Sequence, residues 1–365
     1  LSWLDVNSRL SPVKESQHAI NAKLLFVHLG GTGLETSVIH ARGLEVQQLG
    51  VGGSWKLGSL RWQNRLTDHL AARLKQATGC SIRDDVLAAT RLQRTVELAM
   101  ERLTRSAKVE IKFDWQGTSI QTAITQESFL QIAAELIPTI QEAIALACAN
   151  AKTDIGEIDH ILLAGSMLRM KPIQEIVKRT VPHNVQVTTL EKSDLARGAA
   201  LQTQHYSSLV RSDLLKPRAI GCSVYDFGLL ASSSSSGKTK PRILLEKSST
   251  LPVSITRTLR PSSISGSHTA AFPMLQIIES STVGSGNWLA LGKVKPDELF
   301  PERVGSAPLQ LRLEIDESGI LETSLLWAEG NRQVHLPHTS DPTLSDHDID
   351  VWREWLETTL LCADS

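Results

Sequence analysis

The chain has 365 residues, of which 41% are apolar and 21% charged, and this length predicts two or three domains of a globular protein. A formal net charge of −1 gives no electrostatic basis for binding nucleic acid or an anionic membrane, so we expect neither as a partner. The four cysteines are scattered without metal-ligand or disulfide spacing, which predicts a reduced, cytoplasmic location and no cysteine-bound metal.

The first half of the chain alternates apolar strands with amphipathic helices, which indicates an α/β domain. A mixed, polar lead-in at residues 1–22 precedes it and carries no signal-peptide pattern. In chain order we predict strands at 24–39, as a hairpin, and 43–53, helices at 61–77 and 85–105, strands at 109–113 and 118–124, a helical stretch at 127–151 interrupted near Pro138, a strand at 158–164 buried on both faces, a helix at 172–179, a strand at 185–188 and a helix at 193–203.

The second half has short alternating segments separated by Pro, Gly and Ser, which predicts an all-β sandwich. Residues 212–217 indicate a linker before it, and the serine run 232–236 indicates a flexible loop. Ser345 is positioned to cap a final helix. The predicted strands are 242–246, 254–259, 274–279, 309–315 and 321–327.

The most informative stretch is a glycine turn formed by Gly30, Gly31, Thr32 and Gly33 after an apolar run. Glycines allow backbone N–H groups to approach a phosphate, because no Cβ stands in the way. A second turn at 165–166 also follows a buried strand and precedes a helix, where anions bind readily. Two such turns in one α/β unit favour a ligand between them, and two ordinary tight turns are the alternative interpretation.

Further side chains are candidates for contact with a nucleoside. Glu97 and Thr104 lie seven positions apart, so they share one helix face from which they could reach its hydroxyls and edge. Arg169 could stack its planar guanidinium on a base, and His28 could act as a base in catalysis. The competing interpretations are a solvated helix face, a surface arginine and a hydrogen-bonded histidine at a strand end. We find no Ser/His/Asp arrangement, zinc-binding helix or P-loop lysine in the sequence.

Several short segments together resemble a known protein family, although no single one of them is specific enough alone. They are 79–92 and 97–104 in the helical region, 158–169 around the second turn, 198–200, the dipeptide 214–215, 314–321 and 344–349. In this fixed order they resemble the DnaK-type, seventy-kilodalton heat-shock chaperones, from about Lys23 to Leu356. The resemblance implies the second lobe of an actin-like (ribonuclease H-like) ATPase domain with a helical subdomain, followed by an all-β sandwich and the start of a lid helix.

The same resemblance implies boundaries and contacts. The parts are the lead-in 1–22, the second lobe 23–206, an interdomain linker 207–219, a substrate-binding-like sandwich 220–340 and the start of the lid helix 341–365. The implied nucleotide contacts are Gly30, Gly31, Thr32, Gly33, Glu97, Thr104, Gly165, Ser166 and Arg169. The implied peptide contacts are Phe227 and Leu229, in a segment that resembles a peptide-binding loop, and Phe272, which either fills the peptide pocket or belongs to the core.

The chain departs from the family pattern around the glycine turn. His28 stands where the family has an aspartate near magnesium, and Glu35 replaces a second aspartate. Phosphoryl transfer depends on positioned charge around magnesium and phosphate, so we expect weak or lost binding of ATP or ADP, a doubtful magnesium site and no hydrolysis. The other departures are Ser59, Leu60 and Arg61 for a glycine and two acids, Met100 for a nucleotide-contacting lysine and Lys192 for an aspartate, and the family's first lobe has no counterpart.

These observations favour a divergent heat-shock-type chaperone that binds unfolded or extended protein segments, has cochaperones as partners and carries a degenerate ATP site. Two alternatives stay open. One is an active ATP-dependent chaperone completed by a first lobe upstream of Leu1, since the chain does not begin with Met. The other is a non-catalytic scaffold protein that keeps the chaperone fold without peptide capture.

Overall fold

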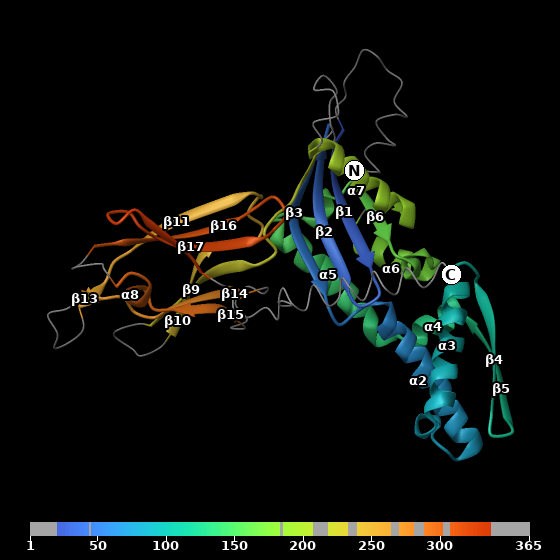
Figure 1. Cartoon of the computed structure of the whole chain (residues 1–365). Helices are drawn as coiled ribbons and strands as arrows, with labels where there is room; N and C mark the ends of the chain where they lie inside the picture. The colour runs from blue at the N-terminus through green and yellow to red at the C-terminus, as the bar shows by residue number, and fades with distance from the viewer. Residues whose placement is uncertain are drawn as a thin grey trace, which may run out of the picture. The chain divides into compact units, whose positions relative to one another are not determined.

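The computed structural model describes residues 20–43, 45–182, 185–206, 218–232, 239–263, 270–280, 288–301 and 307–336. The chain forms two compact units, Leu1–Val224 and Tyr225–Ser365. The first mixes helices and strands, and the second consists mainly of strands (Figure 1). The linker expected at 212–217, most of the serine run and the helix expected after Ser345 lie outside the described residues.

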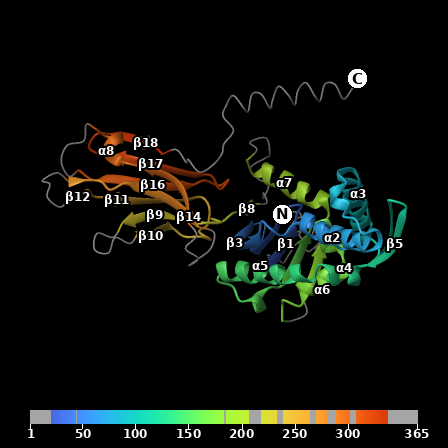
Figure 2. The same cartoon turned by 90° about the horizontal axis from the view of Figure 1, so that it is seen from below.

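The first unit is built on a six-stranded sheet with the order β7-β6-β1-β2-β3-β8. β1, β2 and β3 form antiparallel hairpins, whereas β6, β7 and β8 join in parallel, so the predicted hairpin around the glycine turn is confirmed. Every residue of β6 is buried, because α5 and α6 cover one face of the sheet and α7 the other (Figure 2). The bounds are β1 Asn21–Leu29, β2 Leu34–Arg42, β3 Glu45–Ser54, α5 Ile137–Asn150, β6 His160–Ala164, α6 Lys171–Lys178, β7 Gln186–Thr189, α7 Lys192–Tyr206 and β8 Arg218–Ile220.

Close backbone contact between β3 and α5 fixes how this helix lies on the sheet. A Cβ on Gly52 would lie 2.3 Å from the carbonyl oxygen of Ala143, and a Cβ on Gly50 would lie 2.3 Å from the nitrogen of Ala151. Folded proteins do not tolerate such short separations, so only glycine allows this packing. Thr36 of β2 also donates a hydrogen bond of 2.8 Å from Oγ1 to the Ala143 carbonyl. The helix is therefore held against the backbone of the sheet itself.

The helical stretch predicted at 127–151 is divided between two helices. α4 (Gln126–Ile132) and α5 are separated by a short 3-10 turn, Ala134–Leu136, and the chain bends by 73° there. Pro138 lies in the first turn of α5, where its missing N–H leaves no helical hydrogen bond unmade, so the predicted interruption is confirmed. Within the described ranges, no single helix is both long enough and apolar enough to cross a bilayer.

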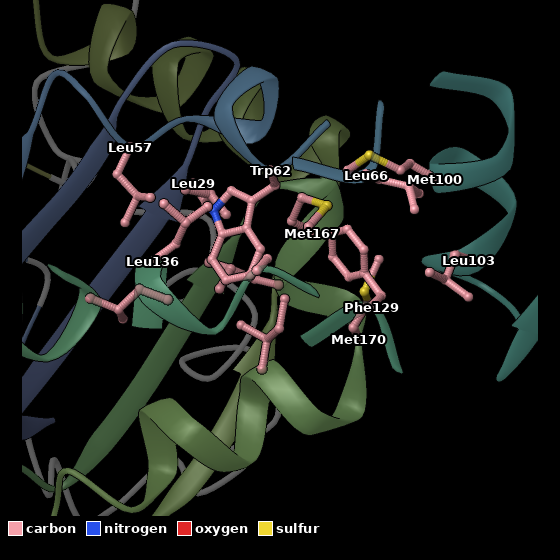
Figure 3. Packing of buried hydrophobic residues seen from close by; sticks show 14 of the residues in the cluster. Leu29, Leu57, Trp62, Leu66, Met100, Leu103, Phe129, Leu136, Met167 and Met170 are labelled. Carbon is pink, nitrogen blue, oxygen red and sulfur yellow. The ribbon is translucent and has the colours of Figure 1, made fainter. Parts of the chain in front are cut away.

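A helical subdomain extends from the sheet on α2 and α3 (Figure 1). As predicted, α2 buries large side chains spaced three or four residues apart, although Ala77 at the end of the predicted face is exposed. Trp62, at the start of this stripe, packs against Phe129 of α4 with ring centroids 5.9 Å apart (Figure 3). The stripe is Trp62, Leu66, Leu70 and Leu74, and the bounds are α2 Ser59–Thr78, α3 Val86–Leu103, β4 Lys108–Trp115 and β5 Thr118–Thr125.

The second unit contains two four-stranded antiparallel sheets, β10-β9-β14-β15 and β11-β16-β17-β18. Apolar side chains from both sheets join in one hydrophobic core, to which β9 contributes Leu229, β14 Ile277 and β16 Leu313. Every strand predicted in this half is present, as β10, β11, β14, β16 and β17. The bounds are β9 Asp226–Ser232, β10 Thr239–Leu245, β11 Val253–Leu259, β12 Ser262–Ser263, β13 Ala270–Ala271, β14 Leu275–Ser280, β15 Leu289–Val294, α8 Pro296–Leu299, β16 Leu309–Ile315, β17 Leu321–Trp327 and β18 Arg332–His335.

Two strands differ from the expectations. Residues 227–230, expected as a loop, lie inside β9, which pairs with β10 on one side and β14 on the other. β8 was not predicted, because three residues are too few to show a period, and it forms only by pairing with β3 at Glu45, Val46 and Gln47. β8 depends on a strand distant in the sequence, whereas β9 pairs with the next strand, β10, and with the more distant β14.

Candidate functional site

A cavity of about 840 Å³ opens where the glycine turn, α2, α3, the end of β6 and the start of α7 come together. Most of the residues expected to contact a nucleotide line it, whereas Thr32 and Gly33 lie on the same turn but are not part of its lining. The expected residues on the cavity wall are Gly30, Gly31, Glu97, Thr104, Gly165, Ser166 and Arg169.

The pairing of β1 with β6 brings the two glycine turns together. These strands are parallel neighbours with His28 opposite Ala164, so the turns that follow them lie side by side. Gly165 has a φ of 109°, and a Cβ on it would lie 2.2 Å from the carbonyl oxygen of Leu29. Only glycine adopts this conformation in this space without strain. The second turn is therefore required by the fold, whatever ligand it meets.

The first glycine turn is fixed by backbone hydrogen bonds. The N–H of Gly30 donates to the carbonyl of Gly33 at 2.9 Å and closes the turn. The first two N–H groups of α2, those of Ser59 and Leu60, donate to the carbonyls of Gly30 and Gly31 at 2.9 and 3.0 Å. Such groups at a helix start are ordinarily free to bind an anion. Here the turn uses both of them, so they are not available to a phosphate.

His28 and Glu35 form a pair beside this turn. They are opposite each other in the β1–β2 hairpin, and Nδ1 of His28 lies 3.2 Å from Oε2 of Glu35. The imidazole also stacks on Phe26 at 6.3 Å between ring centroids. Leu60 lines the cavity with 52% of its surface exposed. In the part of the chain that the structure describes, no group of three or more His, Cys, Asp or Glu residues is placed to hold a metal ion.

The side chains expected to contact a nucleoside come from α3 and from the turn after β6. Glu97 accepts a hydrogen bond of 2.6 Å from Arg94 on the same helix, and Arg169 forms an ion pair with Glu191. Ion pairs at exposed positions contribute about 0–1 kcal/mol each. A ligand that offers comparable hydrogen bonds can therefore displace either partner at little cost.

Comparison with protein-family models matches residues 14–359 to the family described as Hsp70 protein. The chain belongs to the Hsp70 family. It is 25% identical over 339 residues to the chaperone protein DnaK of Prochlorococcus marinus (strain MIT 9515), covering 90% of this chain and 51% of that protein. It is 23% identical over 336 residues to the stromal 70 kDa heat shock-related protein, chloroplastic, of Pisum sativum, covering 90% and 46%. The chain is thus a divergent member that spans about half the length of these curated relatives.

ATP or ADP with magnesium is the typical ligand of Hsp70 proteins, and the two ends of this cavity fit it differently. Around α3, Glu97 and Arg169 offer an acceptor and a planar cation of the kind that contacts a nucleoside. Around the glycine turn, magnesium requires several oxygen ligands, and the side chains there include the His28–Glu35 pair and Leu60. These side chains suit a nucleoside better than a magnesium ion.

Several residues of the cavity wall were not expected from the sequence. Glu101 lies one helical turn after Glu97, so its spacing was a usable signal. Its carbonyl accepts the hydroxyl proton of Thr104 at 2.7 Å, which leaves that hydroxyl available to a ligand as an acceptor. The missed residues include Gln63, Glu101, Arg105, Glu191 and Leu195.

The residues expected to contact a peptide lie in the core of the second unit. Phe227, Leu229 and Phe272 are 6%, 8% and 7% exposed. The backbone N–H of Phe272 donates to Oδ2 of Asp297 at 2.9 Å, which fixes the start of this segment. This burial favours the interpretation of Phe272 as a core residue. Direct contact between these three side chains and a peptide would require the core to rearrange.

Proposed function

We propose that this chain is the second nucleotide-binding lobe and the substrate-binding part of a divergent Hsp70-type chaperone, and that it binds a nucleotide without hydrolysing ATP. The observation that carries the proposal is the cavity, where Glu97, Gly165 and Arg169 meet beside the His28–Glu35 pair. One end offers contacts to a nucleoside, and at the other the carboxylate of Glu35 is paired with His28, which leaves few oxygen ligands for magnesium.

The expected loss of hydrolysis follows from the chemistry at the glycine turn. Phosphoryl transfer is catalysed mainly by positioned charge on the metal and the phosphate oxygens. Removing a single positioned group of this kind typically lowers a catalytic rate about 100- to 1000-fold. Here an imidazole and the apolar Leu60 occupy the surroundings of the turn, so several such contributions are missing together.

We infer that the second unit is a substrate-binding sandwich, that residues 341–365 begin a lid, and that the ligands are unfolded or extended protein segments. Two antiparallel sheets around one core support this inference, because such a frame can present loops to an extended chain. Extended peptides are held by backbone hydrogen bonds and by pockets for alternate side chains. Cochaperones are part of the same proposal.

Calorimetric titration of the chain with adenosine, ADP and ATP tests the nucleotide part, with phosphate release measured in parallel. We expect adenosine to bind equally in magnesium and in EDTA, and no phosphate release above the blank. Glu97→Ala should weaken binding, whereas Glu142→Ala, an exposed glutamate on α5, should not. Absence of adenosine binding, or hydrolysis that depends on magnesium, would contradict the proposal. Hydrolysis only after addition of an upstream first lobe would support an active chaperone instead.

A scaffold that keeps the fold without peptide capture is the second candidate. The burial of Phe227 and Phe272 favours it, since neither side chain offers an apolar surface to a ligand. Fluorescence anisotropy with labelled apolar heptapeptides separates the two candidates. Saturable binding supports the chaperone, and its absence over the whole accessible concentration range supports the scaffold.

A further inference from the structure

The imidazole of His28 lies over the glycine turn with one nitrogen held and the other open. Glu35 holds Nδ1 at 3.2 Å, and no partner of Nε2 occurs among the described residues. A Cβ built on Gly30 would lie 3.4 Å from Cε1 and 3.8 Å from Nε2 of this ring. The side chain is 29% exposed and lines the cavity. A hydrogen-bonding nitrogen is thus presented to the cavity at the turn.

Gly31 adds a backbone donor on the wall of the same cavity. The N–H of Gly30 closes the turn, whereas the N–H of Gly31 has no acceptor within the described ranges. A Cβ on Gly31 would meet nothing within 4 Å, and this residue lines the cavity. An oxygen atom of a ligand can therefore approach the backbone of Gly31 without meeting a side chain.

We propose that His28, oriented by Glu35, takes the place of a divalent cation at the glycine turn, so that its open nitrogen Nε2 and the N–H of Gly31 hold one phosphate group of a nucleotide without metal. The inference rests on the proposed function, because it places the phosphate of a nucleotide whose base contacts α3. Charge-assisted hydrogen bonds of this kind are roughly twice as strong as neutral ones. Leu60 offers no charge beyond the turn, which favours one phosphate group over three.

Charged groups face His28 from most elements around the cavity. The side chains from α2 at the cavity are uncharged. The charged groups are Glu35 on β2, Glu97, Glu101 and Arg105 on α3, Arg169 after β6, and Glu191 and Lys192 at the start of α7.

Calorimetric titration in EDTA with adenosine, ADP and inorganic phosphate tests the subsite. We expect ADP to bind roughly tenfold more tightly than adenosine. Added magnesium should not strengthen ADP binding, because the metal also complexes the phosphates of free ADP. Inorganic phosphate should compete with ADP and not with adenosine.

A variant pair isolates the imidazole. His28→Asn should remove the advantage of ADP over adenosine, whereas His69→Asn, an exposed histidine of α2 outside the cavity lining, should preserve it. If adenosine does not bind, the proposed function itself fails. If adenosine binds but ADP binds no more tightly, or only with magnesium, this inference is overturned. If His28→Asn does not fold, the affinity of the unchanged chain for ADP in EDTA and in magnesium still tests the inference.

Discussion

The glycines of β3 and the glycines of the turn after β1 lie in or next to the same sheet, but they are present for different structural reasons. A Cβ on Gly52 would lie 2.3 Å from the Ala143 carbonyl, whereas a Cβ on Gly31 would meet nothing within 4 Å. The first glycine is required by the packing of α5. Gly31 is not required by the fold, because no packing contact excludes a side chain there and its φ is not positive. An open glycine on a cavity wall is therefore better evidence for a ligand than a glycine fixed by packing.

Gly52→Ala is the strongest test of this contrast. The added methyl group overlaps the backbone of α5, which cannot move without leaving the sheet, so we expect the free energy of unfolding to fall by about 3 kcal/mol or more. Urea denaturation followed by circular dichroism measures this change. A loss below about 1 kcal/mol would show that α5 can shift and that β3 does not need glycine there.

Gly165→Ala tests the glycine that belongs to both categories, because it lines the cavity and is also fixed by packing. Its φ of 109° and the short distance to the Leu29 carbonyl predict a loss of about 3 kcal/mol or more in the free energy of unfolding, as for Gly52. The same urea titration measures it. Unchanged stability would place Gly165 with Gly31, as a residue whose side chain position is open.

A pH titration examines β6, the strand that leads into Gly165. Burial lowers the pKa of His160 below its ordinary 6.5, and its Nε2 lies 2.8 Å from Oγ1 of Thr188. The unfolded chain then binds this proton more readily than the folded protein. Stability is therefore full above pH 6.5 and falls as the pH drops through the lowered pKa.

Melting temperatures at pH 7.5 and pH 5.5 check this expectation. We expect the drop between them to be about 2 °C smaller in His160→Gln than in the unchanged chain. Part of the drop should persist, because partial burial also lowers the pKa of His40. An equal drop in both proteins would show that His160 does not contribute.

Gly31→Ala should have the smallest effect on the fold. The new methyl group meets no protein atom, so we expect the free energy of unfolding to stay within about 0.5 kcal/mol of the unchanged chain. Binding of ADP should nevertheless weaken, because the methyl group stands where a phosphate oxygen would approach. Equal ADP binding, measured by calorimetry, would remove the distinction between the two kinds of glycine.

Much of the first unit could be predicted from the sequence because its signals are local. The hairpin around Gly30 and the buried strand β6 follow from short apolar runs, and the stripe that begins at Trp62 follows from helical spacing. β8 was missed because its only signal is the partner strand β3, distant in the chain. The segment around Phe227 was expected to be a loop because of the family resemblance, whereas its pairing with β10 and β14 makes it strand β9.

The residues that line the site could largely be predicted from the sequence, whereas their ion pairs and hydrogen bonds could not. Glu97, Gly165 and Arg169 meet in one cavity, as the order of turns and helices indicated. The ion pair between Arg169 and Glu191 and the use of the first α2 amides by the glycine turn depend on distances across the fold. No spacing in the sequence encodes those distances.

The bonds from Ser59 and Leu60 to the glycine turn have a mechanical consequence. They join backbone to backbone, so replacing either side chain leaves them intact, proline excepted. α2 has 20 residues and is about 30 Å long, and its far end lies in the helical subdomain. A small rotation imposed at the turn would therefore be carried to the tip of the subdomain as a much larger displacement. This mechanical coupling between the turn and the subdomain would remain even if substitutions had removed the catalytic groups at the turn.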